Sequence, residues 1–198
     1  MPADPSLELF HPRTRGEWRR WLAKHHASAR GIQLVFARQG SGIPTIGYDE
    51  AVEEALCFGW VDSIARKLDE HRRAQLFTPR KPKSTWSRSN KERVGRLIGA
   101  GLMTDAGLKK IESAKADGSW GFLDSIEALE IPADLAAALK KNAKAQKNFD
   151  AFPPSSKKII LLWVASAKRE ETRAKRVAET VSLAAKNIRA NHYDNTRK

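Results

Sequence analysis

The spacing of the apolar residues changes along the chain, and this change confines any sheet to the first part of the protein. Residues 32–36 and 60–78 combine alternation with the β-rich composition that is typical of strands. Beyond Pro79 the apolar residues recur three and four positions apart, which is the helical spacing. The sequence therefore predicts an α+β fold, in which a small, mainly antiparallel sheet with packed helices is followed by an all-helical C-terminal module.

Four elements are expected before Pro79. Thr14 and Glu17 have the spacing of a capping box at the start of the first helix, and Gly59 is suited to end the second one. In chain order, the pattern predicts a helix from Thr14 to about Ala27, a strand over 32–36, a helix from about Ala51 to Gly59, and a β-hairpin over 60–78 with its turn near 68–71.

The rest of the chain is expected to form a loop and then helices. Prolines 79 and 82 end the second hairpin strand and begin a loop that extends to about Ser89. Further helices are predicted near 90–101 and 104–118, from Pro132 as a first helical residue, from a cap at Ser155 or Ser156, and from about Glu170 to Ile188. We expect an α/β module over 1–125, a helical module over 126–190 and a tail over 191–198.

The formal net charge of +13 is concentrated in two segments. Lysines and arginines minus acidic residues give zero over 1–59, +8 over 60–116, −5 over 117–139 and +10 over 140–198. Clustered cations attract and retain polyanions, which favours an anionic partner such as nucleic acid, phosphate or anionic lipid. The alternative is that these lysines and arginines only keep the surface solvated.

Several classes of protein are excluded or disfavoured. The longest apolar run, 159–165, is far shorter than the roughly 20 residues of a membrane-spanning helix. The first residues contain no secretory signal, and the single cysteine, Cys57, excludes an intrachain disulfide and an all-cysteine zinc site. No nucleotide-binding or hydrolase motif is present, and the histidines lack metal-ligand spacing. We expect a cytoplasmic protein without a cofactor or bound metal.

The loop before the helix near 90–101 is the first candidate binding site. Free N–H groups and the positive dipole end of a helix attract an anion, and this loop adds cations, hydroxyls and an indole face for stacking. Alternatively, Ser87 or Ser89 only caps the helix, the indole anchors the core and the cations are solvated. The residues concerned are Arg80, Lys81, Lys83, Ser84, Trp86, Ser87 and Asn90.

A second candidate is a row of arginines on the last predicted helix. Arg169, Arg173 and Arg176 are spaced four and three apart and so share one helical face. The row can clamp an acidic ligand, or it can pair internally with nearby glutamates or with the acidic segment 117–139.

The residues Cys57, Asp62 and His71 offer an enzymatic alternative. Cysteine catalysis requires a thiolate activated by a positioned base, and the spacing does not establish that Cys57 meets a histidine. In the structural alternative, Cys57 packs at a helix end, Trp60 begins a strand, and Asp62 bonds the backbone or an arginine.

Three motifs occur along the chain, namely Ala-Leu-Cys-Phe-Gly-Trp-Val-Asp-Ser (55–63), Phe-Thr-Pro-Arg-Lys-Pro-Lys-Ser-x-Trp-Ser-x-x-Asn (77–90) and Ala-Lys-Arg-x-x-Thr-Arg-x-x-Arg (167–176). They resemble motifs of the YdeI/OmpD-associated proteins, also called the bacteriocin-protection family. The resemblance extends over about residues 7–189 and implies a bacterial source, an α/β module similar to YdhG-like proteins and a helical module that carries the last motif. The family name points to tolerance of bacteriocins or envelope stress and to a porin connection.

Two main hypotheses follow. In the first, the protein is not an enzyme and binds a phosphate-bearing or other anionic small molecule at the loop, with Trp60, Asp62 and the arginine row as further ligand-binding residues. In the second, it is an enzyme of unknown reaction with a cationic pocket beside Cys57 and Asp62. A broad basic face would instead indicate nucleic-acid binding, and an exposed apolar patch on the helical module would indicate a stress-tolerance protein that acts through protein partners.

Overall fold

The computed structural model describes residues 7–192 and divides into two compact units between Gly121 and Phe122. The sequence pattern places this boundary a few residues later, at 125. Most of the predicted C-terminal tail, residues 193–198, lies outside the described residues. Each unit has its own hydrophobic core.

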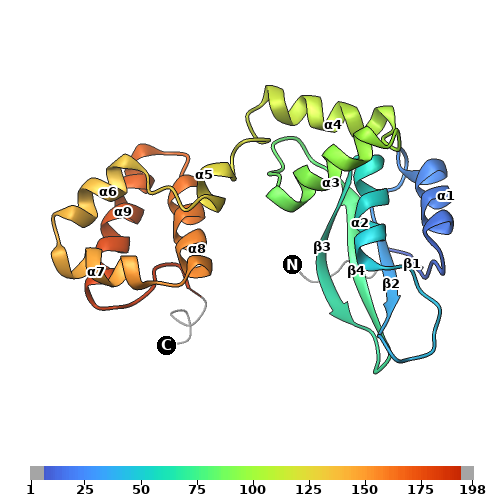
Figure 1. Ribbon diagram of the computed structural model, residues 1–198, viewed down its shortest axis with the longest axis horizontal. Coiled ribbons are helices and arrows are strands. Elements are labelled where there is room, and N and C mark those ends of the chain that lie inside the picture. The colour runs from blue at the N-terminus through green and yellow to red at the C-terminus, as the bar shows by residue number, and fades with distance from the viewer. Residues whose placement is uncertain (1–6, 193–198) are drawn as a thin grey trace. The chain divides into compact units, whose positions relative to one another are not determined.

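The first unit contains one four-stranded sheet in the order β1-β2-β4-β3 (Figure 1). The short strand β1 (Leu9–Phe10) runs parallel to β2 (Ile32–Ala37), and the other neighbours are antiparallel. The strands β3 (Trp60–Lys67) and β4 (Arg72–Pro79) form the predicted hairpin, with an irregularity between Asp62 and Ala65. The mainly antiparallel sheet expected from the alternating segments is therefore confirmed.

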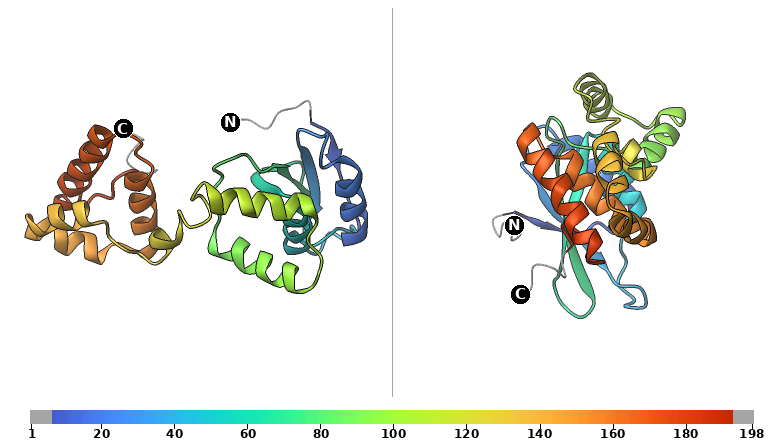
Figure 2. Two further views of the ribbon diagram at one scale, coloured as in Figure 1. Left: turned by 90° about the horizontal axis from the view of Figure 1, so that it is seen from above. Right: turned by 90° about the vertical axis from the view of Figure 1, so that its left-hand side faces the viewer.

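Four helices of this unit lie on one side of the sheet (Figure 2). Three of them begin at a side-chain cap, in which a Thr14, Ser87 or Thr104 oxygen accepts the backbone N–H three residues later. Such a cap contributes about 1 kcal/mol to the stability of a helix. The helices are α1 (Arg15–His25), α2 (Tyr48–Cys57), α3 (Arg88–Gly99) and α4 (Asp105–Ala116).

The core of the first unit fills the space between the sheet and these helices. Apolar side chains of β2 and β4 on the helix-facing side pack against buried tryptophans, among them Trp18 and Trp86. Helix α4 approaches the end of α2 closely at Gly107, where an added Cβ would lie 2.4 Å from the Cys57 carbonyl oxygen. This close approach brings α4 beside the loop that follows β4.

The second unit consists of helices, as the spacing beyond Pro79 predicts for the C-terminal part. Helix α9 contacts α6, α7 and α8 around a core that includes Leu139, Phe149 and Ile160. The α+β class is thus confirmed. The helices are α5 (Asp124–Glu127), α6 (Ala133–Lys140), α7 (Ala143–Ala151), α8 (Pro154–Ala165) and α9 (Glu170–Ala185).

Some helix ends differ from the predicted ones. Pro132 is the residue before α6, and α8 begins at Pro154 after Pro153, so neither Ser155 nor Ser156 is the cap. Proline suits these positions because its fixed φ matches a helix start and it has no N–H to satisfy. Helix α9 ends before Ile188 because the chain turns into a left-handed conformation after Ala185.

Over residues 7–192, none of the helices has both the length and the apolar character that crossing a bilayer requires.

Candidate functional site

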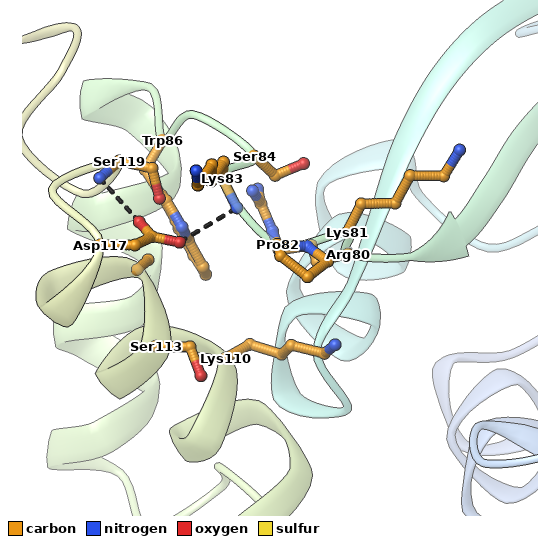
Figure 3. A pocket seen from close by; sticks show the side chains of 11 residues that line it. Arg80, Lys81, Pro82, Lys83, Ser84, Trp86, Lys110, Ser113, Asp117 and Ser119 are labelled. Carbon is orange, nitrogen blue, oxygen red and sulfur yellow. Dashed lines mark hydrogen bonds between the residues drawn. The ribbon is translucent and has the colours of Figure 1, made fainter.

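The loop after β4 lines a small cavity in the first unit (Figure 3). The cavity has a volume of about 130 Å³. One wall is the loop from Arg80 to Ser84 together with Trp86, the second is helix α4, and the third is the turn that follows α4. The lining residues outside the loop are Lys110, Ser113, Ala114, Asp117 and Ser119.

Arg80 is the most unusual residue of the cavity, because it is a cation that is only 3% exposed. Its guanidinium carbon lies 3.7 Å from the centre of the Trp86 ring, and its Nη1 donates to the Thr85 carbonyl oxygen over 3.2 Å. Within the part of the chain that the structure describes, its buried Nε has no hydrogen-bond partner. The stacking and the single bond hold the side chain in place and leave its charge without a paired anion.

The electrostatic consequence is a lowered pKa of Arg80. Burial lowers the pKa of Arg80 to about 10, and the charge of Asp62 counteracts only part of this fall. Removing a guanidinium from water disfavours its charged form unless an opposite charge is nearby. At neutral pH Arg80 is still protonated, so the protein keeps a poorly compensated positive charge at this cavity.

Asp117 ties the loop to the end of α4. One carboxylate oxygen accepts the Lys83 backbone N–H over 3.1 Å, and the other accepts the Ser119 N–H over 2.9 Å. Ser119 holds the pKa of Asp117 below its usual value, and the backbone N–H of Lys83 adds to this effect. Lys83 has a positive φ of 61°, which is uncommon outside glycine, so this contact fixes a backbone that would otherwise be disfavoured.

The cavity is positively charged overall. Among the described residues that line it, four are cations, namely Arg80, Lys81, Lys83 and Lys110, and one, Asp117, is acidic. Figure 3 shows the Arg80 guanidinium between the loop and Trp86, with Lys110 passing below, whereas Lys81 extends away from the other side chains. Arg80 and Lys110 are therefore the cations that a bound anion would meet first.

Not every residue predicted in the loop lines the cavity. Ser84 and Trp86 do, although Trp86 is only 1% exposed and offers a ring face that Arg80 already covers. Ser87 caps α3 by accepting the Asn90 N–H, and the Asn90 side-chain oxygen accepts a bond from Arg93. Ser87 thus matches the alternative in which a serine caps the helix.

The residues of the first motif lie near the cavity but outside it. Trp60 is buried and donates from Nε1 to the His26 carbonyl oxygen. Asp62 accepts hydrogen bonds from the Tyr48 hydroxyl over 2.6 Å and from Gln75 over 3.1 Å. Burial and this bond to Asp62 raise the pKa of Tyr48 to about 12.

Cys57, Asp62 and His71 are not brought together as an enzyme centre. Cys57 is fully buried, and burial raises the pKa of its thiol, with the charge of Glu54 adding to the rise. His71 is exposed in the hairpin turn, where its N–H bonds Asp69. No metal-binding group of three or more histidine, cysteine or acidic side chains occurs among residues 7–192.

The arginine row lies on the second unit and makes contacts there. Arg169 precedes the first turn of α9 as its N-cap residue, and Arg173 pairs through two hydrogen bonds with Asp134 of the acidic segment. Arg176 bonds the Trp163 carbonyl oxygen and the Ser166 hydroxyl. Arg173 and Arg176 thus take part in internal contacts of the helical unit.

The half of the cavity that comes from α4 and the turn after it could not be predicted from the sequence. Lys110, Ser113, Asp117 and Ser119 are about 30 residues from the loop in the sequence. The only local signal was the Asp117-Gly118-Ser119 turn, because aspartate readily accepts backbone N–H groups in such turns.

Two family models match the chain. A domain of unknown function (DUF8412) matches residues 10–110, just over half of the chain and most of the first unit. The model described as bacteriocin-protection, YdeI or OmpD-associated matches residues 128–187 in the second unit, which supports the expected family over the segment that contains the third motif. The first two motifs lie within the DUF8412 match. No curated protein and no solved structure matches the chain.

Proposed function

Because the chain belongs to the DUF8412 family, which is described as a domain of unknown function, and its residues 128–187 match the bacteriocin-protection, YdeI or OmpD-associated model, we propose a binding function. The protein holds a small anion, such as a phosphate group, in the cavity beside Arg80. It acts by binding and not by catalysis. The observation that carries this proposal is the buried guanidinium of Arg80, whose charge is only partly compensated, by Asp62, among residues 7–192.

Physical chemistry favours an anion at this position. A buried charge without a counterion is costly, and an anion in the cavity would offset that cost through charge-assisted hydrogen bonds to arginine and lysine. Arginine is also the side chain whose planar fork best fits phosphate oxygens. The proposal therefore assigns Arg80 and Lys110 to the anion and Asp117 to the support of the loop.

The size of the cavity limits what enters it. Pockets that enclose whole drug-sized ligands measure roughly 300–1,000 Å³. The cavity of about 130 Å³ is well below that range but far larger than the space needed by one water molecule. It suits a small polyatomic anion or the charged end of a larger molecule.

The first test is calorimetric titration of the full chain with inorganic phosphate at low and at high salt. We expect saturable binding that weakens as salt is raised, because the attraction is electrostatic. Lys110→Ala should weaken phosphate binding at least fivefold. Lys109→Ala is the matched control, since it removes the same charge from the neighbouring position of α4 outside the cavity.

Two results would contradict the proposal. One is the absence of phosphate or sulfate binding at any salt concentration. The other is an equal loss of affinity in the Lys110→Ala and Lys109→Ala variants, which would indicate a diffuse charge effect and no defined site.

We also infer that this binding serves a cytoplasmic protein of a bacterium. The single cysteine supports a reducing compartment, and the family description supports a role in bacteriocin protection. The inference is tested in a bacterial strain that lacks the protein, by comparing bacteriocin survival after complementation with the wild type and with Lys110→Ala. Equal survival of the two complemented strains would show that bacteriocin protection does not depend on anion binding.

A further inference from the structure

A second hollow adjoins the anion cavity along helix α4. This hollow, called here the α4 groove, has a volume of about 450 Å³ and shares Lys110 and Ser113 with the cavity. Its volume lies within the range of pockets that hold whole small molecules. The two hollows therefore differ in size and meet at the same two side chains.

The α4 groove is lined differently from the cavity. Most of its lining is apolar and comes from Ala27, Phe58, Pro79 and Ala106, together with the backbone of Gly59 and the edge of buried Trp60. Lysines lie only on the α4 side of the groove. An apolar wall next to a cationic cavity fits a molecule with one charged end and a less polar body.

Gly59 explains how the Lys110 side chain comes to lie at the junction. A Cβ on Gly59 would be 2.7 Å from Lys110 Cγ and 3.0 Å from the Ala106 carbonyl oxygen. The aliphatic part of Lys110 thus passes directly over the glycine backbone, which a larger residue would prevent. Gly59 also has a positive φ of 73°. Both the close approach of Lys110 and this backbone conformation therefore require glycine at position 59.

His26 supplies one polar group within the apolar part of the groove. Its Nδ1 lies 2.9 Å from the Leu22 carbonyl oxygen, so Nδ1 is the donor and the neutral ring keeps its lone pair on Nε2. The ring also packs against Phe58, with centroids 5.2 Å apart. His26 can therefore hold one orientation and offer Nε2 as a hydrogen-bond acceptor to a ligand.

From this arrangement we propose that the ligand is an organic phosphate, a phosphomonoester with an uncharged and partly apolar body. Its phosphate group occupies the cavity beside Arg80, and its body lies along the α4 groove across the Lys110 side chain. This inference rests on the proposed anion binding and names the class of molecule bound. Free inorganic phosphate would use the cavity and leave the groove without a ligand.

The test compares three probes that carry the same charged group and differ in the body: inorganic phosphate, methyl phosphate and phenyl phosphate. Calorimetric titration of the full chain should give about tenfold tighter binding for phenyl phosphate than for methyl phosphate. The gain comes from the apolar ring area that the groove removes from water.

A pair of variants tests whether the uncharged body of the ligand lies in the α4 groove. Ala106→Phe fills the groove at a position that is not part of the cavity lining, whereas Ala116→Phe adds the same side chain to an exposed position of α4 outside both hollows. Ala106→Phe should abolish the preference for phenyl phosphate and leave the affinity for inorganic phosphate within twofold. Ala116→Phe should retain the preference.

The possible results are distinguishable. Equal affinities for the three probes would overturn the organic-phosphate inference while the proposed anion binding stands. A preference for phenyl phosphate that survives Ala106→Phe would overturn the assignment of the body to the groove. Failure of all three probes to bind would instead overturn the proposed function itself.

Discussion

Replacing Arg80 with methionine gives the sharpest prediction, because the sign of the effect depends on whether the buried charge is compensated. Methionine has a similar length and remains apolar, so it fills the place of the arginine without its charge. If the guanidinium is an uncompensated buried cation, Arg80→Met should stabilise the protein in anion-free buffer. If Arg80 only stabilises the loop through its contacts, the same change should destabilise the protein.

The expected magnitude follows from the contacts of Arg80. Its pKa of about 10 lies more than two pH units below the ordinary arginine value, and each unit corresponds to about 1.4 kcal/mol. The buried charge therefore costs about 3 kcal/mol at neutral pH. Methionine would forfeit the stacking on Trp86 and the bond to the Thr85 carbonyl, about 1 kcal/mol each. The net expectation is a gain of about 1 kcal/mol.

The pH dependence has a defined sign. The folded-state pKa of Arg80 is below its unfolded value, so the unfolded chain binds the proton more tightly. The cost is fully present below about pH 10 and fades as the pH rises through that value. The stabilisation by Arg80→Met should thus be constant near neutral pH and shrink in strongly alkaline buffer.

Urea denaturation followed by tryptophan fluorescence measures this difference. Trp163 is the only one of the six tryptophans in the second unit, so a Trp163→Phe background restricts the signal to the first unit. Arg93→Met is the matched control, because Arg93 pairs with Asp49 on the surface. This control should lose up to about 1 kcal/mol.

The same denaturation is then repeated with phosphate, to measure how much the bound anion stabilises the folded state. A ligand at 100 times its dissociation constant stabilises the folded state by about 2.7 kcal/mol. Wild-type protein and Arg93→Met should show such a gain, and Arg80→Met should not. A loss of 1 kcal/mol or more in anion-free Arg80→Met, or an undiminished response to phosphate, would show that Arg80 is not an uncompensated buried cation that binds the anion.

Three further predictions concern stability and can be measured by the same denaturation assay. Gly107→Ala should lower the free energy of unfolding by about 1–3 kcal/mol, because its Cβ would lie 2.4 Å from a carbonyl oxygen of α2. Gly95→Ala, with open space around it, should raise that free energy by about 0.5–1 kcal/mol. Equal effects would contradict the close approach of α4. Glu54→Gln should lower the free energy of unfolding by about 3–5 kcal/mol, since this 2%-exposed carboxylate binds two arginines of α1. A loss below 1 kcal/mol would show that the ion pairs are dispensable. Arg173→Ala should cost less than about 1 kcal/mol because its pair with Asp134 is partly solvated, and an effect that salt does not reduce would argue against simple pairing.

The class of fold could be predicted because its signals are local in the sequence. Alternation in 32–36 and 60–78 and helical spacing afterwards depend only on which side chains share a face, so the α+β order and the hairpin were confirmed. Helix starts at prolines were less accurate, as at Pro154, because serine and proline both suit a helix start and the packing of the preceding turn decides between them.

Cations, hydroxyls and an indole can be placed together before α3 from the chain order alone, because these residues are neighbours along the chain. What each of them does depends on how the unit packs. Arg80 is buried because the loop folds back onto Trp86, and the cavity exists because α4 brings Lys110 and Asp117 against a loop that lies about 30 residues earlier. Burial and long-range packing are properties of the whole unit, and no local pattern encodes them.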